Sequence, residues 1–264
     1  IAGIAQGSKL IDSFHLQNAR SLTKNSPVNS IKGLALWYET TLSESFNESE
    51  TDNESPITVW HDINPQHASI KEAVSVGDSD ALYIKKGQND LPVLKFNGTD
   101  NTYSNATLQL GKDMSSFAVI RIETLGANRR ILSINERFYF GTLNVSGTSE
   151  FRSFYGTSAG WNHHTSFGSD ADLATNKYYI LSSNLKDSIN TGYVNGVNVG
   201  SPTGSTSETK EPSSGITIGS SIIGTQYWPG YIGEIIIFDR GLSDINRKEI
   251  EKYLSKKWNI PVSS

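Results

Sequence analysis

The sequence predicts a mainly β protein that begins and ends with a helix. From residue 31 onward, short apolar runs alternate with clusters of Gly, Asn, Ser and Pro, which is typical of an all-β sandwich or barrel. Clear helical periodicity occurs only before Pro27 and after Ser243. The 264 residues suit one large domain with an appendage. We therefore expect a helix and its linker over residues 1–29 and a β-sandwich over residues 30–264.

Composition and charge exclude several classes of function. The formal net charge of −4 argues against the basic face that a nucleic-acid-binding protein needs. The chain contains no Cys, which excludes disulfide scaffolds, thiolate zinc sites and cysteine nucleophiles. No run of like charges indicates a polyanion or a membrane surface as a partner. We therefore expect no nucleic-acid partner.

Apolar stretches bounded by turn residues predict the strands of the sandwich. They cover residues 33–38, 117–124, 130–134, 137–140 and 177–182. Residues 193–199 predict a hairpin, because Asn195-Gly196 tolerates the positive φ angles of a type I′ turn. Residues 232–238 are too apolar for a strand with one solvated face, so this strand should lie centrally in its sheet.

One helix is predicted near the C-terminus. Ser243 is a natural N-cap, and an apolar stripe follows at helical spacing, formed by Ile250, Tyr253, Leu254 and Trp258. Pro261 should end the helix. Two other segments predict loops: residues 44–56, which are acidic and should be mobile at the surface, and residues 200–215.

The first 26 residues predict a long helix whose first half is apolar. Ile1, Ile4 and Ile11 lie on one helical face, and Pro27 should end the helix by about residue 25 or 26. Gly3 and Gly7 form a G-x-x-x-G pair, which lets helices pack closely in apolar surroundings. Each Gly costs about 0.8–1 kcal/mol in a solvated helix. The pattern therefore favours neighbouring helices or lipid around this segment, and the alternative is a helix that folds onto its own domain.

Residues 1–11, Ile-Ala-Gly-Ile-Ala-Gln-Gly-Ser-Lys-Leu-Ile, resemble the middle of the long N-terminal helix of type IV pilins and pseudopilins. Residues 18–28 resemble prepilin-type proteins in which this helix leads directly into a β domain. The more hydrophobic stretch with a Glu that precedes the segment in that family is not in the sequence, so we expect the chain to begin inside a longer helix. The resemblance implies an extracellular pilus, or fimbrium, built from identical subunits that are anchored in the inner membrane before assembly. It places the filament contacts on Ile1, Gly3, Ile4, Gly7, Ile11 and Phe14.

The β region resembles the concanavalin A-like, laminin G-like (LamG) jelly rolls. The resemblance rests on the segments 34–38, 59–62 with its Trp-x-Asp turn, 91–98, 231–240 and 242–260. It implies a jelly-roll sandwich in a lectin-like module that binds surface glycans. The chain departs from the family at Glu39-Thr40-Thr41 and at Ile63-Asn64-Pro65, which weakens any inherited ligand or metal contact in these two loops.

We expect no enzymatic activity. The family that the β region resembles includes glucanases, which use two carboxyl groups about 5–5.5 Å apart. In those enzymes the two groups come from one strand with the pattern Glu-x-Asp-x-Glu or the bulged pattern Glu-x-Asp-x-x-Glu. Glu234 and Asp239 imitate the outer spacing of the bulged pattern, but Ile236 occupies the place of its middle Asp. Residues 156–160 match G-x-S-x-G, yet no helical pattern follows them as a nucleophile elbow requires.

Ligand and metal candidates lie in the predicted loops. The rings of Trp161, His163 and Trp228 could stack on sugars, with core aromatics as the alternative. The LamG-like resemblance also implies Ca²⁺, which prefers oxygen ligands. The candidates are Asn97, Asp100, Asp170 and Asp172, and ordinary turns are the alternative. His163 and His164 point to opposite sides of an extended chain, so one metal ion would need further ligands.

The sequence thus supports one leading functional hypothesis and one alternative. The leading hypothesis is a structural subunit of a type IV pilus-like filament, with the helix in its core and the sandwich displayed outside for adhesion. The alternative is a secreted or surface carbohydrate-binding module that does not polymerise. A glycoside hydrolase is a third hypothesis, and it would depend on Glu234.

Overall fold

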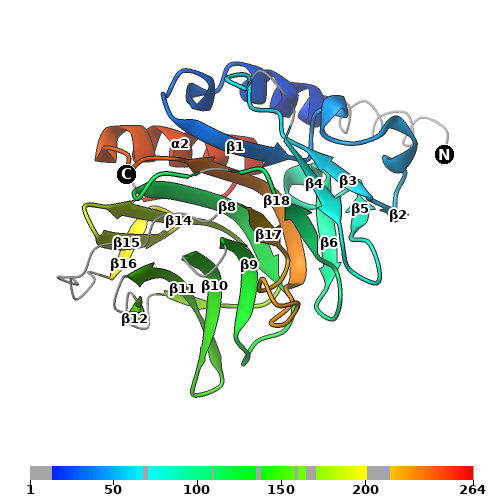
Figure 1. Cartoon of the computed structure of the whole chain (residues 1–264). Coiled ribbons are helices and arrows are strands. Elements are labelled where there is room, and N and C mark those ends of the chain that lie inside the picture. The colour runs from blue at the N-terminus through cyan, green and yellow to red at the C-terminus, as the bar shows by residue number, and fades with distance from the viewer. Residues whose placement is uncertain are drawn as a thin grey trace.

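The computed structural model is a β-sandwich with a helical layer on one side (Figure 1). It describes residues 14–67, 71–108, 110–134, 138–157, 160–164, 171–200 and 215–263. Within these residues two antiparallel sheets form, each of nine strands. The predicted fold class, a mainly β sandwich with a helix near each end, is confirmed.

Sheet A carries the helices. Its strands follow the order β16-β15-β14-β8-β18-β6-β5-β2, and β1 also pairs with β18. Their bounds are β1 Leu34–Glu39, β2 Ser55–Pro56, β5 Leu82–Ile84, β6 Val93–Asn97, β8 Met114–Ile122, β14 Tyr178–Lys186, β15 Ile189–Val194, β16 Val197–Gly200 and β18 Pro229–Phe238. The apolar segment 232–238 lies in β18, between β8 on one side and β6 and β1 on the other, which confirms its predicted central place.

Sheet B lies on the other side of the main core. Its strands follow the order β12-β11-β10-β9-β17-β7-β4-β3, with β13 on β11. Their bounds are β3 Val59–His61, β4 Glu72–Ser75, β7 Tyr103–Asn105, β9 Arg129–Ile134, β10 Phe138–Val145, β11 Thr148–Thr157, β12 Gly160–His164, β13 Asp172–Leu173 and β17 Ile216–Ile218.

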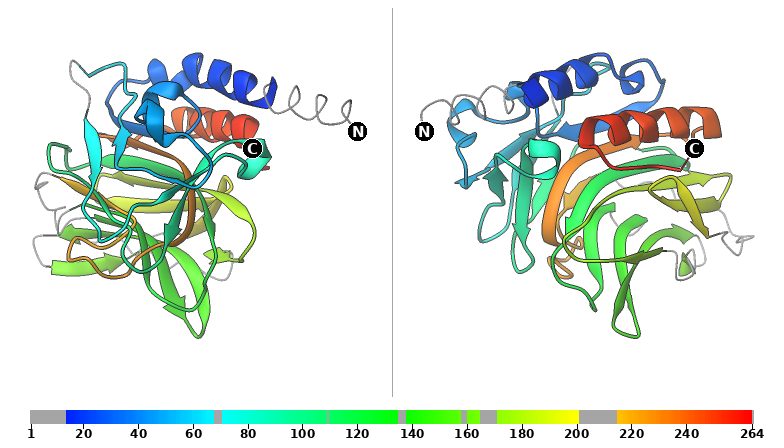
Figure 2. Two further views of the ribbon diagram at one scale, coloured as in Figure 1. Left: turned by 90° about the vertical axis from the view of Figure 1, so that its right-hand side faces the viewer. Right: turned by 180° about the vertical axis from the view of Figure 1, so that it is seen from behind.

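Two apolar cores hold the three layers together. The first lies between the sheets and includes Trp60, Phe138 and Phe140. The second lies between sheet A and the helices and includes Trp37 and Trp258. Figures 1 and 2 show the helices side by side along the outer face of sheet A. Because both faces of its central strand are covered, β18 has no exposed apolar face to shield from water.

A helix and a hairpin turn lie at the residues that local sequence signals predict. The C-terminal helix α2 runs over Asp244–Trp258, and the Ser243 hydroxyl accepts a hydrogen bond from the Asn246 N–H. The hairpin between β15 and β16 turns at Asn195 and Gly196, whose φ angles of 49° and 78° fit a type I′ turn. The predictions for this helix and this turn are confirmed.

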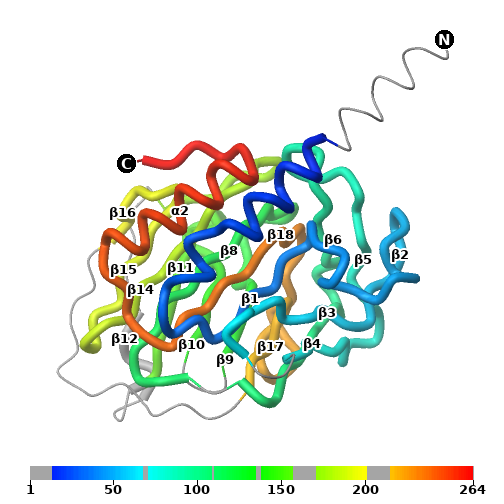
Figure 3. Tube along the Cα trace, turned by 90° about the horizontal axis from the view of Figure 1, so that it is seen from above, coloured from blue at the N-terminus to red at the C-terminus, as the bar shows by residue number. Residues whose placement is uncertain are grey.

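The described part of the N-terminal helix, residues 14–24, packs on its own domain beside α2 (Figure 3). Ala19 and Thr23 are buried, and Leu16 and Leu22 pack against the second core. The guanidinium of Arg20 donates from Nε to the carbonyl oxygen of Thr41 at 2.7 Å. The helix ends at residue 24, one or two residues before the predicted end, and the 3₁₀ helix η1, Pro27–Asn29, follows.

Phe14 is the one predicted filament residue that the structure describes, and 65% of its surface is exposed. Ile1, Gly3, Ile4, Gly7 and Ile11 lie outside the described residues. Among the described helices, none has both the length and the apolar character needed to cross a membrane.

The acidic segment 44–56 is more ordered than its composition predicts. Two 3₁₀ helices form here, η2 over Ser43–Ser45 and η3 over Glu48–Glu50. Phe46 is buried and stacks on Trp60, with ring centroids 6.2 Å apart. The expectation of a mobile surface loop is therefore corrected, because one aromatic side chain anchors the segment in the core. Most of the other predicted loop, residues 200–215, lies outside the described residues.

A buried ion cluster joins the helical layer to sheet A. The Nζ of Lys257, on α2, lies 2.7 Å from a carboxylate oxygen of Glu39 and 2.9 Å from one of Glu234. All three side chains are fully buried. Glu234 also accepts hydrogen bonds from Trp37 Nε1, Tyr253 Oη and Trp258 Nε1, at 2.7, 2.8 and 2.8 Å. The charges are thus stabilised by direct contacts in place of water.

The same contacts control the protonation of the cluster. Burial alone would raise the pKa of Glu39, but the charge of Lys257 and the hydrogen bonds from Lys257 and Thr41 outweigh it and hold the pKa below 4.5. Burial alone would lower the pKa of Lys257, but the two carboxylates outweigh it and raise the pKa above 10.5.

We predict that Lys257→Met lowers the free energy of unfolding by about 3–5 kcal/mol, because it leaves two buried carboxylates without their cation. Lys256→Met is the matched control, since Lys256 lies beside it on α2 and is exposed. Urea denaturation of both variants measures the effect. Equal stability of the two variants would show that the ion cluster does not hold α2 on the sheet.

We predict that stability falls at both ends of the pH range. The lowered pKa of Glu39 means that its contribution is complete above 4.5 and is lost as the pH falls through the folded value. The raised pKa of Lys257 means that its contribution is complete below 10.5 and is lost as the pH rises through the folded value. Urea denaturation across this range should show a flatter alkaline limb in Lys257→Met than in Lys256→Met. If the stability of the two variants depended on pH in the same way, Lys257 would not be the group that causes the alkaline loss of stability.

Candidate functional site

The carboxylate that the hydrolase hypothesis needs is inside the protein. Glu234 is fully buried in the ion cluster described above, and its four partners come from β1 and α2. Asp239 is exposed in the turn after β18 and does not join it. In this structure Glu234 therefore binds α2 to the sheet and has no access to a substrate.

The G-x-S-x-G match does not form a nucleophile elbow. β11 runs to Thr157, and another strand, β12, begins at Gly160. An elbow needs a helix at that point, because the helix N-terminus and the sharp turn expose the serine. A strand, and not a helix, thus follows the motif, as the absence of a helical pattern in the sequence predicted.

The three aromatic candidates for sugar stacking have different places. Trp228 is 0% exposed and belongs to the core between the sheets, so the interpretation of its ring as a surface platform is corrected. The backbone N–H of Trp228 donates to the Gly219 carbonyl at 2.8 Å, which holds the segment before β18 against the sandwich. Trp161 and His163 lie on β12, the edge strand of sheet B, where His163 pairs with Tyr155 of β11. For these two residues, sugar stacking stays a prediction.

The calcium candidates also lie in different parts of the structure. The Asn97 side-chain oxygen accepts from the N–H groups of Thr99 and Asp100, at 2.9 and 3.1 Å. Hydrogen bonds from Ser79 and Asn97 hold the pKa of Asp100 below its usual range. The Asn97 oxygen thus closes an Asx turn. For these residues calcium binding stays a prediction. Asp172 is exposed on β13, Asp170 is outside the described residues, and no group of three acidic or histidine side chains gathers in the described part.

The Trp-x-Asp segment is structural. The ring of Trp60 lies in the core between the sheets and donates from Nε1 to the Glu39 carbonyl at 2.9 Å. The carboxylate of Asp62 accepts from the N–H groups of Trp37 and Asn64 and lies 2.9 Å from His67 Nδ1. This carboxylate therefore fixes the path of the chain after β3.

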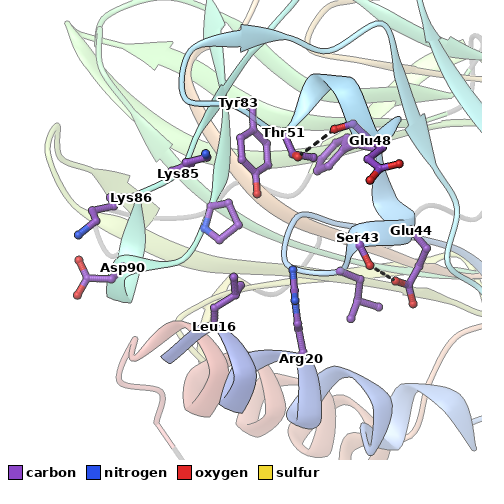
Figure 4. Close-up of a pocket in the computed structure, with 13 residues that line it drawn as sticks. Leu16, Arg20, Ser43, Glu44, Glu48, Thr51, Tyr83, Lys85, Lys86 and Asp90 are labelled. Atoms are coloured by element: carbon purple, nitrogen blue, oxygen red, sulfur yellow. Dashed lines mark hydrogen bonds between the residues drawn. The ribbon is translucent and has the colours of Figure 1, made fainter. Parts of the chain in front are cut away.

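A pocket of about 740 Å³ opens between the N-terminal helix, the segment 42–51 and the region from β5 to β6 (Figure 4). Its volume is within the range of about 300–1,000 Å³ that is typical of small-molecule sites. The apolar lining comes from Leu16, Leu42, Phe46, Tyr83 and Pro92. The polar lining comes from Arg20, Ser43, Glu44, Glu48, Thr51, Lys85, Lys86 and Asp90. We call it the helix–loop pocket.

Two hydrogen-bond donors point into the helix–loop pocket from different layers. Figure 4 shows the Tyr83 hydroxyl and the Arg20 side chain directed toward the same space. Burial, followed by the charge of Glu39, raises the pKa of Tyr83 to about 12, although Arg20 lowers it, so the hydroxyl stays protonated at neutral pH. Neither the Tyr83 hydroxyl nor the Arg20 Nη atoms have a hydrogen-bond partner within the described part of the chain, so both can bind a ligand.

Glu39 builds the loop that borders this pocket. Its carboxylate accepts hydrogen bonds from the N–H groups of Thr41 and Leu42, at 2.9 and 2.6 Å, and from the hydroxyls of Thr41 and Ser45, at 2.6 and 2.8 Å. Because the same carboxylate pairs with Lys257, the ion cluster and the pocket wall share one residue. The pocket wall is therefore held by buried contacts and is formed before any ligand arrives.

Sequence reasoning did not identify the helix–loop pocket. Its residues come from three separate segments, and none of these carries a local motif for binding. The available signal was weak: the departure at Glu39-Thr40-Thr41 from the LamG-like pattern, followed by an acidic segment that contains one aromatic residue, Phe46.

Comparisons with known proteins agree with this architecture. The family model of the concanavalin A-like lectin/glucanases superfamily matches residues 96–246. No curated protein matches the chain by sequence. The fold is similar to that of domain 4 of AbnA, a GH43 extracellular arabinanase from Geobacillus stearothermophilus, in complex with arabinotriose. That match has 13% identity and a TM-score of 0.58, and it covers 83% of this chain and 97% of the other.

Two larger proteins contain a similar fold. The binding domain of Paraclostridial Mosquitocidal Protein 1 matches at 13% identity and a TM-score of 0.56, over 87% of this chain and 53% of the other. The Trypanosoma rangeli sialidase in complex with the inhibitor DANA matches at 16% identity and a TM-score of 0.53. This match covers 88% of the chain but only 34% of the sialidase. The family match spans more than half of the sequence, and the chain therefore belongs to the concanavalin A-like lectin/glucanases superfamily.

Proposed function

We propose that the protein is a carbohydrate-binding module and that the helix–loop pocket is its ligand site. The observation that carries the proposal is the composition of this pocket. Its apolar floor is buried, whereas most of its polar lining residues are exposed and form a rim; the floor consists of Leu42, Phe46, Tyr83 and Pro92. A sugar ring has the complementary character, with C–H groups on its faces and hydroxyl groups around its edge. The superfamily and the arabinotriose complex of the similar arabinanase domain support a saccharide as the class of ligand.

The side chains of the helix–loop pocket suit hydroxyl recognition. Glu44 and Glu48 provide acceptors, while Arg20, Lys85 and the Tyr83 hydroxyl provide donors. Charged partners strengthen hydrogen bonds to neutral hydroxyls. The apolar floor excludes water from one side of the ring. The mixture of both charge signs favours a neutral saccharide over a strongly charged one.

We predict that Tyr83→Phe weakens saccharide binding by about threefold to tenfold, because it removes one hydrogen bond and leaves the ring in place. Isothermal titration with arabinotriose, after a glycan array has ranked other saccharides, measures the change. Tyr231→Phe is the matched control, since Tyr231 lies on β18, outside the pocket, and pairs with Lys95. If no saccharide on the array binds the native chain, or if both variants bind equally well, the helix–loop pocket is not the carbohydrate site.

A filament subunit is the second candidate function. The observation that favours it is Phe14, an apolar side chain that is 65% exposed at the outer end of the docked helix. In that arrangement residues 14–24 would fix the sandwich to the helix, and the apolar residues that precede them would contact other subunits. The resemblance of residues 1–11 to type IV pilins supports the same assignment.

We predict for this second candidate that the 264-residue chain associates and that a chain without residues 1–13 remains a monomer. The truncation keeps Ala19 and Thr23, which cover the second core, so the shortened chain should stay folded. Sedimentation velocity gives the state of association, and circular dichroism checks the fold. If both chains sediment as monomers, the filament hypothesis is wrong and the carbohydrate proposal is unaffected.

A further inference from the structure

Arg130 is a buried cation without a carboxylate partner. It lies on β9, only 7% of its surface is exposed, and no carboxylate lies within ion-pair distance of it in the described part of the chain. Its guanidinium carbon is 4.7 Å from the centre of the Tyr139 ring and 5.7 Å from that of Phe154. These three side chains lie on the outer face of sheet B, whereas Phe138 and Phe140 lie in the core.

The hydrogen bonds of this guanidinium are incomplete. Nη1 makes two long contacts of 3.4 Å, with the carbonyl oxygens of Arg129 and Thr142. Nε is buried and has no partner, and Nη2 makes no hydrogen bond to a described residue. A buried charge without an ionic partner is costly, and cation–π contacts recover only about 0.5–2 kcal/mol each.

Other buried arginines in the described residues differ in this respect. Arg152 lies 2.6 Å from Glu150, and Arg247 lies 2.6 Å from Glu251. Arg247 is also stacked on a tyrosine, at 3.7 Å from the Tyr193 ring, and it keeps its carboxylate. In Arg247 the aromatic neighbour therefore accompanies a carboxylate counter-ion and does not replace it. Arg130 has aromatic neighbours but no carboxylate counter-ion in the described part of the chain.

A pocket of about 370 Å³ lies beside Arg130. The lining is completed by Tyr139, Ser221, Ile222, Ile223, Thr225 and Gln226. Two backbone hydrogen bonds hold the loop in place, from Ser221 N–H to the Thr225 carbonyl at 2.8 Å and from Arg130 N–H to the Gln226 carbonyl at 2.9 Å. The pocket is therefore preformed, and its volume suits a ligand of about one sugar ring.

We propose that this pocket binds a carboxylate carried by a small polar ligand, such as an acidic sugar, with Arg130 as the counter-ion. The planar guanidinium matches a planar carboxylate in two parallel hydrogen bonds. One unpaired cation balances one negative charge, which favours a carboxylate over a dianionic phosphate. Ser221, Thr225 and Gln226 supply polar groups for hydroxyls, and Ile223, 78% exposed, supplies an apolar edge. This site is separate from the helix–loop pocket and does not depend on its function.

The experiment compares acidic and neutral sugars of the same shape. ¹⁵N-labelled protein is titrated with sodium glucuronate or galacturonate, and with glucose or galactose in equal sodium chloride, while the Arg130 Nε–Hε resonance is followed. We expect a saturable shift with at least one acidic sugar and binding at least about tenfold weaker with its neutral counterpart. A titration with acetate shows whether the sugar ring contributes to the affinity beyond the carboxylate. No shift with either acid, or equal affinity for the neutral sugars, overturns the proposal.

Variants test the assignment to Arg130. Arg130→Met should abolish binding of the acidic sugar, and Arg130→Lys, which keeps the charge but loses the planar fork, should weaken it by about tenfold. Arg121→Met is the matched control, since Arg121 also stacks on a tyrosine, Tyr231 at 4.5 Å, but on sheet A. If Arg130→Met does not fold, the resonance shift in the native protein still decides. Undiminished binding in the folded Arg130→Met or Arg130→Lys variant contradicts the proposal.

Discussion

The neutralisation of two buried carboxylates by one lysine is the interaction on which the arrangement of this protein depends. Lys257 comes from α2, while Glu39 and Glu234 come from neighbouring strands of sheet A. Such a cluster is stable only when every charge keeps its partner. The helix must therefore lie at one position along the sheet, a constraint that apolar packing alone would not impose. Thr23 extends this constraint to the N-terminal helix through its contact with Tyr253, 3.3 Å away.

The helix–loop pocket is a consequence of this cluster. Glu39 directs its carboxylate both to α2 and to the loop that borders the pocket, and Arg20 ties the N-terminal helix to the same loop. Three elements that are distant in sequence therefore meet at fixed positions. The Arg130 pocket has another origin, because it is built on the outer face of sheet B by one strand pair and the loop before β18. The two sites also differ in charge, since the first combines both signs and the second presents one unpaired cation.

Several sequence-based interpretations failed for a common physical reason. The sequence pattern places Trp228 in a loop, yet its large apolar surface is buried between the sheets. The composition of the acidic segment 44–56 predicts mobility, yet Phe46 anchors the segment. In both segments one aromatic residue outweighs polar neighbours, because burying such a side chain contributes about 1.5–3 kcal/mol, whereas polar neighbours can remain in water. Glu234 shows the reverse, since it is charged and still fully buried.

The helices and strands could be predicted from the amino-acid sequence, because their signals are local. Turn residues at Asn195-Gly196, the Ser243 cap and the apolar run 232–238 each act within a few residues, so the sandwich, the hairpin and the central strand could be predicted. The packing of distant segments decides which polar groups are buried together and where pockets open. Glu39 and Lys257 are separated by 218 positions. Arg130 has no carboxylate partner in the described part of the chain solely because of what folds around it. Contacts of this kind depend on how distant segments pack, and no local pattern in the chain encodes them.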